Sequence, residues 1–145
     1  DRFLMRIELG YPEPSLERQL LLGRDRRDLL VSLAPALTPQ QLLRLQGEVP
    51  RVHASDALLD YVQAIALHTR QSSEFEAGLS PRAVIGLLRA AQAWALMHAH
   101  PGVLPEDVQA VLPSVAGHRL APRESSRFRD AGQVGQFVLE TVPVP

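Results

Sequence analysis

Apolar and polar residues alternate at the start of the chain. Every second residue from Phe3 to Leu9 is apolar, and charged side chains stand at positions 6 and 8. Because successive side chains of a β-strand point to opposite faces, this period predicts a half-buried strand. The run Gly10-Tyr11-Pro12 ends it. A strand without its sheet would expose unpaired backbone groups, so we expect it to be disordered, to fold onto helices or to pair with another copy.

Beyond residue 13 the apolar residues follow the spacing of helices. The clearest helix covers residues 56–70, where one stripe contains Leu58, Val62 and Ile65 and Ser55 provides the N-cap. Further helices are predicted at residues 14–23, 25–33, 39–45, 81–99 and from 105 onward. Pro113 predicts that the last of these is interrupted or kinked.

The connections between these helices have less regular patterns. Residues 49–53 are predicted as an extended connector, 71–77 as a polar loop and 119–129 as an exposed linker. Asp130 and Gln133 have the spacing of a capping box, which predicts a short terminal helix. A strand over residues 137–142 is the alternative.

Composition supports a mainly helical fold. The 145 residues suit one domain, 46% of them are apolar and only 5% are aromatic, with many leucines and alanines. The expected class is therefore mainly all-α, with a helical bundle preceded by one short N-terminal strand.

Charge and residue usage exclude several kinds of function. The net charge is −1, so there is no basic field to attract nucleic acid, and the apolar runs are too short for membrane insertion. All fifteen basic residues are arginine, so the chain cannot contain the lysine of a Walker phosphate loop. It has no cysteine, which fits a reducing, cytoplasmic location.

The start of the helix at 81–99 is the strongest candidate for a site. Ser80 precedes a proline and is suited to an N-cap, and Pro81 suits the first helical position. Arg82 then lies in the first turn, beside free backbone N–H groups and the positive end of the helix dipole. A phosphate would satisfy both the arginine and these N–H groups. The alternative is an ion pair between Arg82 and a carboxylate on another helix.

Other polar residues give weaker signals. His98 and His100 are two positions apart, which does not place both rings on one helix face, so no metal site is expected. The spacing of serines, histidines and carboxylates reveals no nucleophile and base, so we expect no independent active site. By composition alone Arg2 is an ordinary terminal residue.

Several short motifs in the same order resemble MoxR-type AAA+ ATPases. They are the opening DRFLMRIELGYPEP, the Ser80-Pro81-Arg82 run followed by AVIGLLRAAQAWAL, and the segment VLPEDVQAVLPSVAGHRL. Val52, Tyr61 and the Thr69-Arg70 pair also fit, as does the terminal VPVP. Together these motifs span most of the chain.

The resemblance implies a fold and a division of the chain. Residues 1–12 would be the end of the AAA+ core with its last strand, residues 13–120 the helical lid domain, and residues 121–145 a linker with a short C-terminal helix. Two features depart from the family pattern: Leu104 stands where a Thr or Ser cap is usual, so that helix start would fray, and residues 120–130 fit poorly.

The resemblance also implies functional roles. Arg82, introduced by Ser80 and Pro81, would be the sensor 2 arginine that reaches the γ-phosphate of ATP on the core. Arg2 would be an arginine finger acting in trans on a neighbouring subunit's nucleotide. ATP and Mg²⁺ would be the cofactors of a longer protein. We expect neither to be bound by this chain alone, because it reads as a fragment without the phosphate loop.

The partners implied are the protein's own AAA+ core and neighbouring subunits of a homo-oligomeric, hexameric ring. A partner protein with a von Willebrand factor A domain, subject to chaperone-like remodelling or maturation, would be the client. The competing hypothesis is a helical protein-interaction module without a nucleotide role, in which Arg82 is a structural ion-pair residue.

Overall fold

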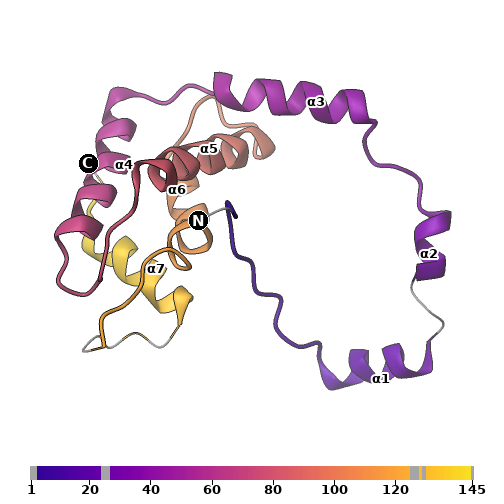
Figure 1. Cartoon of the computed structure of the whole chain (residues 1–145). Helices are drawn as coiled ribbons and strands as arrows, with labels where there is room; N and C mark the ends of the chain where they lie inside the picture. The colour runs from indigo at the N-terminus through magenta and orange to yellow at the C-terminus, as the bar shows by residue number, and fades with distance from the viewer. Residues whose placement is uncertain (1–2, 24–26, 125–127, 129, 145) are drawn as a thin grey trace. The chain divides into compact units, whose positions relative to one another are not determined.

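The computed structural model describes residues 3–23, 27–124, 128 and 130–144. These residues contain seven α-helices, as the mainly all-α class predicts (Figure 1). The chain divides into two compact units, which are described separately. Residues 8–45 form the leucine-rich unit, and residues 1–7 together with 46–145 form the packed unit. The domain boundaries expected at residues 12 and 120 stay predictions.

The leucine-rich unit contains three helices close to the ranges that the sequence pattern predicts. They are α1 (Pro14–Leu22), α2 (Arg27–Ser32) and α3 (Pro39–Glu48), the last of which extends beyond residue 45. Thr38 caps α3 through a reciprocal pair of hydrogen bonds with Gln41, at 3.2 and 2.8 Å. Neither α1 nor α3 contains a buried residue. The helical pattern of this unit is thus visible in sequence, but its leucines lie at the surface.

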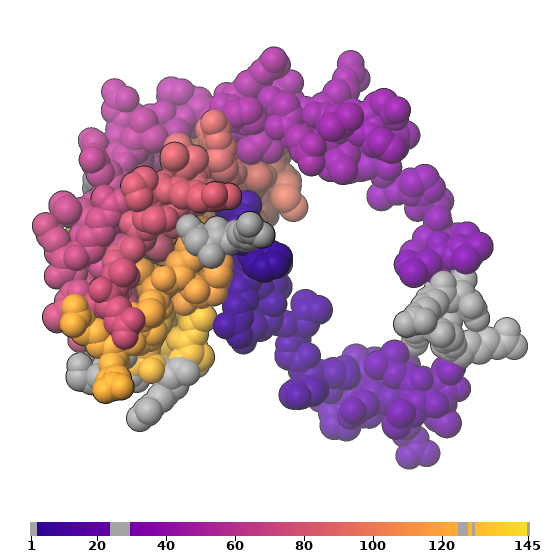
Figure 2. Space-filling model, in the orientation of Figure 1, coloured from indigo at the N-terminus to yellow at the C-terminus, as the bar shows by residue number. Residues whose placement is uncertain are grey.

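The packed unit is built from four longer helices. They are α4 (Asp56–Gln71), α5 (Pro81–Met97), α6 (Pro105–Ala116) and α7 (Ala131–Thr141). The helix α6 packs against α5 and α7, and α4 contacts all three. Their apolar stripes form one core, whose most buried large side chains are Tyr61, Ile65, Phe75, Leu79, Leu87 and Leu112. The space-filling view shows these helices in close contact (Figure 2).

Helix caps fix where these elements begin. The Ser55 hydroxyl accepts a hydrogen bond from Leu58 N (3.3 Å), and Asp130 accepts one from Gln133 N (2.9 Å), which confirms the terminal helix over the alternative strand.

The start of α6 is held without the usual Thr or Ser cap. The buried Asp107 carboxylate accepts from Leu104 N at 2.8 Å and lies 3.0 Å from His100 Nδ1. The first contact is one half of a capping box, and the second gives the Asp107 carboxylate a further partner at the helix start. The frayed start expected from Leu104 is therefore wrong.

Two predicted extended segments differ from the structure. Residues 49–51 form a 3₁₀ turn (Val49–Arg51) instead of an extended connector. Residues 3–9 belong to no β-ladder within the described part of the chain. Instead Arg6 N donates to Ser114 O at 2.9 Å, and Met5 packs against the core. Of the alternating apolar side chains only Met5 packs against the core, whereas Phe3, Ile7 and Leu9 are exposed. We call residues 3–7 the N-terminal segment.

The segment predicted as an exposed linker at 119–129 is largely tied down where it is described. Leu120 is buried, and a single antiparallel bridge joins Pro122 to Phe75 in the loop after α4. Arg123 donates to the Phe75 carbonyl at 2.9 Å, and the Phe128 ring stacks on the Phe75 ring. The polar composition of this segment concealed contacts that depend on a distant loop.

Pro113 does not interrupt α6, which is continuous to Ala116. It lies where α7 crosses at very close range, because a Cβ atom added to Gly135 would be 2.5 Å from Pro113 Cα and 2.7 Å from its Cβ. Only a residue without a side chain allows this approach.

Among the described helices none has the length and hydropathy that crossing a bilayer requires.

The close contact between Gly135 and Pro113 predicts opposite results for two Gly→Ala substitutions in helices. Gly135→Ala should lower the free energy of unfolding by about 1–3 kcal/mol, because the added methyl overpacks the α6–α7 contact. Gly47→Ala is the matched control, since no atom lies within 4 Å of its added Cβ. The control should be neutral or stabilise by about 0.5–1 kcal/mol. Denaturant unfolding measures both, and equal effects would contradict the close crossing.

Candidate functional site

The start of α5 has the local geometry that the sequence predicts. Ser80 is extended (φ −67°, ψ 158°), and its hydroxyl accepts a hydrogen bond from Ala83 N at 3.2 Å. Pro81 occupies the first turn, and Arg82 follows it with an exposed side chain. The remaining N–H groups of the first turn point out of the helix end, as in any α-helix. We call this end of α5, residues 78–82, the α5 mouth.

The α5 mouth is fastened to the end of α4 by two side chains. The buried Thr69 hydroxyl accepts from Leu79 N at 3.1 Å and donates to Ala66 O at 2.8 Å. Arg70 Nε donates to Leu79 O at 3.0 Å. A Cβ on Gly78 would lie 2.5 Å from the Arg70 backbone, so the loop crosses α4 where only glycine fits. Both backbone polar groups of Leu79 are thus satisfied, and the direction of α5 is set.

Arg82 forms no hydrogen bond or ion pair with any residue that the structure describes. The alternative in which a carboxylate on another helix pairs with it therefore finds no support among those residues.

A second arginine, Arg119, interacts electrostatically with Arg82. Burial first, and then the positive charge of Arg82, lower the pKa of the Arg119 guanidinium from its ordinary value. Sequence reasoning assigned no role to Arg119, because it was placed in an exposed linker. The segment carrying it belongs to the family-like run of motifs, but no helix spacing pointed to it.

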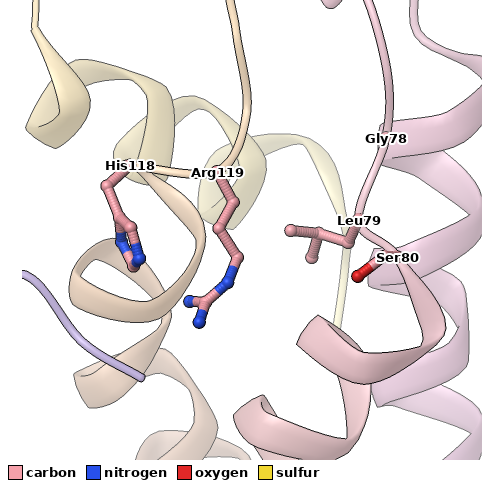
Figure 3. Close-up of a pocket in the computed structure, with 5 residues that line it drawn as sticks. All are labelled: Gly78, Leu79, Ser80, His118 and Arg119. Carbon is pink, nitrogen blue, oxygen red and sulfur yellow. The ribbon is translucent and has the colours of Figure 1, made fainter. Parts of the chain in front are cut away.

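His118, Arg119 and the α5 mouth surround one cavity (Figure 3). Its volume is about 290 Å³, and Gly78, Leu79, Ser80, His118 and Arg119 line it. None of these lining residues is acidic. In the close-up the Arg119 side chain extends between His118 and the residues of the α5 mouth.

Both His118 and Arg119 also reach the N-terminal segment. Arg119 donates to Leu4 O at 2.8 Å, to Phe3 O and to the carbonyl of Val115. His118 Nε2 lies 3.3 Å from the same Phe3 oxygen, and its Nδ1 lies 3.1 Å from Ser114 O. The start of the chain is therefore held beside the candidate site. Arg2 itself lies outside the described residues.

These groups can bind an anion but offer little else chemically. The site combines cationic side chains with a helix N-terminus, which is the arrangement that favours phosphate. The Ser80 hydroxyl already serves as a cap. Two other histidines have their own contacts: His98 contacts the Trp94 carbonyl, and His100 contacts Asp107. Among the described residues no group of three or more His, Cys, Asp or Glu side chains could hold a metal.

Comparisons with known proteins agree with this architecture. The family model of the AAA lid domain matches residues 67–136, which include the end of α4, the α5 mouth and most of α7. The chain is 33% identical to YeaC of Bacillus subtilis, 35% identical to chaperone MoxR1 of Mycobacterium tuberculosis and 30% identical to protein MoxR of Paracoccus denitrificans. Each match covers 100% of this chain but only 46%, 41% and 49% of the relative, respectively. The chain thus spans about half the length of these relatives.

A solved structure shares the fold. It is the crystal structure of a candidate ATPase from Cytophaga hutchinsonii, with a TM-score of 0.79 and 24% sequence identity. The match covers 99% of this chain and 47% of that one.

The fastening of the α5 mouth to α4 predicts a sensitive position at Thr69. Thr69→Val should lower the free energy of unfolding by about 1–3 kcal/mol, because it leaves the buried Leu79 N–H without an acceptor. Thr69→Ser keeps the hydroxyl and is the matched control, with a smaller loss expected. Thermal and denaturant unfolding measure both variants. A loss of stability in Thr69→Val no larger than that in Thr69→Ser would contradict the role assigned to the hydroxyl.

Proposed function

Because the chain belongs to the MoxR-type AAA+ ATPases and contains their helical lid, we propose that it closes over ATP held by a nucleotide-binding core. In this proposal the lid senses the ATP phosphate through Arg82. Closure couples hydrolysis to chaperone-like remodelling or maturation of a partner protein. The chain covers about half of its relatives' length. In this proposal the core lies in a longer protein.

One observation carries this proposal. An exposed guanidinium stands at a capped helix N-terminus, without a carboxylate partner among the described residues and within the field of a second arginine. Without an anion, both the helix dipole and Arg119 act unfavourably on the charge of Arg82. A bound triphosphate would offset both unfavourable interactions, because its negative charge attracts the two arginines and the helix N-terminus. The planar guanidinium can also donate to two phosphate oxygens at once.

The residues present fit one end of a nucleotide and leave the rest to the core. Arg82 would contact the γ-phosphate, and Ser80 and Pro81 would hold it in place by fixing the first turn of α5. ATP with Mg²⁺ would supply the phosphoryl group that is transferred to water. This lysine-free chain cannot supply the Walker lysine.

Arg2 is proposed as an arginine finger that acts in trans on a neighbouring subunit. Such a finger accelerates phosphoryl transfer by about 10³–10⁵ when it stabilises transition-state charge. It requires a ring of subunits, and we propose a cytoplasmic homo-oligomer, hexameric by family analogy. A protein with a von Willebrand factor A domain is the proposed client.

A specific observation also favours the second candidate, a helical protein-interaction module. An apolar groove of about 460 Å³ lies between α4 and α5, lined by Leu59, Val62, Val84, Ile85 and Leu88 among others. Ile85 is 63% exposed there. In this reading a partner binds the groove and Arg82 has no nucleotide role.

Substitution of Arg82 separates the two candidates. In the longer protein that includes the nucleotide-binding core, Arg82→Ala should weaken ATP binding or turnover by about 10–100-fold, because a charge-assisted contact to phosphate is lost. Nucleotide titration and steady-state ATPase assays measure the effect. Arg82→Lys should restore part of it.

The matched control is Arg89→Ala, which removes an exposed arginine two turns further along α5. It should leave nucleotide affinity and turnover within about twofold of the wild type. Unchanged affinity and turnover in Arg82→Ala would refute the sensing role and favour the interaction module.

A further inference from the structure

Arg119 occupies a position between two parts of the packed unit that are far apart in sequence. On one side it lines a cavity together with Leu79 and Ser80 of the α5 mouth, and the positive charge of Arg82 contributes to lowering the pKa of its guanidinium. On the other it donates to two consecutive carbonyls of the N-terminal segment, those of Phe3 and Leu4. Those residues directly follow Arg2, the proposed arginine finger.

We propose that Arg119 is a positioning residue that links phosphate binding at Arg82 to the placement of the N-terminal segment. The inference rests on the proposed phosphate role of Arg82, which it extends to a second element. The link is electrostatic on the Arg82 side and consists of hydrogen bonds on the side of the N-terminal segment.

The N-terminal segment is docked at several points, so it can transmit a displacement as a unit. Arg6 N donates to Ser114 O near the end of α6, and Met5 packs against the core. The side chain of Leu4 lies against α5, where a Cβ added to Gly86 would be 3.0 Å from Leu4 Cδ1. We call the hydrogen bonds from the Arg119 guanidinium to the Phe3 and Leu4 carbonyls the clamp. Unlike the contacts of Leu4, Met5 and the Arg6 amide, the clamp involves a charged group beside the α5 mouth.

The physical coupling follows from like charges. Arg82 and Arg119 carry like charges and repel each other. The Arg119 guanidinium is held by the Phe3 and Leu4 carbonyls, and the backbone of the α5 mouth is held by Thr69. An anion bound at Arg82 screens the repulsion and so lowers the electrostatic cost of holding the Arg119 guanidinium against the two carbonyls. Phosphate at the lid would thereby order the segment that leads to Arg2, so binding and the finger would be coupled energetically.

Hydrogen exchange tests the clamp before any nucleotide is added. In the longer protein, Arg119→Ala should speed amide exchange over residues 4–7, including the Arg6 amide, by about tenfold or more. Arg123→Ala is the matched control, because Arg123 also donates from its guanidinium to a backbone carbonyl, that of Phe75. It should leave exchange of residues 4–7 unchanged. Unchanged exchange in Arg119→Ala would overturn the clamp.

Adding a non-hydrolysable ATP analogue tests the link. In the wild type it should slow exchange over residues 4–7, and in Arg119→Ala this protection should be lost. ATPase assays should then show about a tenfold loss of kcat in Arg119→Ala with KM for ATP changed less than about twofold. The link is refuted if Arg119→Ala speeds amide exchange over residues 4–7 but keeps the wild-type kcat. It is also refuted if the ATP analogue does not slow this exchange in the wild type.

The outcomes separate this proposal from the sensing role of Arg82. Arg82→Ala should keep the clamp without nucleotide and lose the protection that the analogue gives. If Arg82→Ala binds nucleotide normally, the sensing role of Arg82 is refuted. Amide exchange over residues 4–7 in Arg119→Ala, measured without nucleotide, still tests whether Arg119 holds the N-terminal segment. Should Arg119→Ala unfold, Arg119→Lys replaces it, because one ammonium group cannot span both carbonyls in the geometry of the guanidinium.

Discussion

The arrangement of the candidate site depends on two hydrogen bonds at the end of α4. Thr69 accepts from the Leu79 amide, and Arg70 donates to the Leu79 carbonyl, so both polar groups of one buried residue are satisfied. That residue precedes the cap of α5. Its fixed position decides where the first turn of α5 points and hence where Arg82 presents its charge. The glycine at position 78 permits this approach, because any side chain there would meet the backbone of Arg70.

Close backbone approach recurs at the other end of the packed unit. Gly135 of α7 crosses Pro113 of α6 at a distance that excludes a side chain. The helix α6 therefore lies between α5 and α7, with Val108 and Leu112 fully buried. This packing places the loop after α6, with His118 and Arg119, beside the α5 mouth. The position of the second arginine thus follows from how tightly α7 holds α6.

The candidate site contains polar groups that already have hydrogen-bond partners and one exposed cation that has none among the described residues. Ser80 serves as a cap and Arg119 donates to backbone carbonyls, whereas Arg82 has no partner among the described residues. An exposed cation held by a rigid helix start is suited to recognising an anion that arrives with another domain or subunit. In the proposed function, this division between supporting and exposed groups would let the lid present one half of a nucleotide site already formed.

The sequence by itself determined the helices of both units, the caps at Ser55, Ser80 and Asp130, and the place of Arg82 in the first turn of α5. These features depend on periodicity and on residues within one turn of each other, so local physics specifies them. The tertiary structure decided what lies beside them. The apolar alternation at residues 3–9 predicted a strand, but a strand needs a partner, and the described chain instead docks this segment on helices. The contacts of Arg119 with the Phe3 and Leu4 carbonyls were equally invisible, because those residues are more than a hundred positions away in the chain. Contacts across such separations depend on how helices pack, and no local pattern records them.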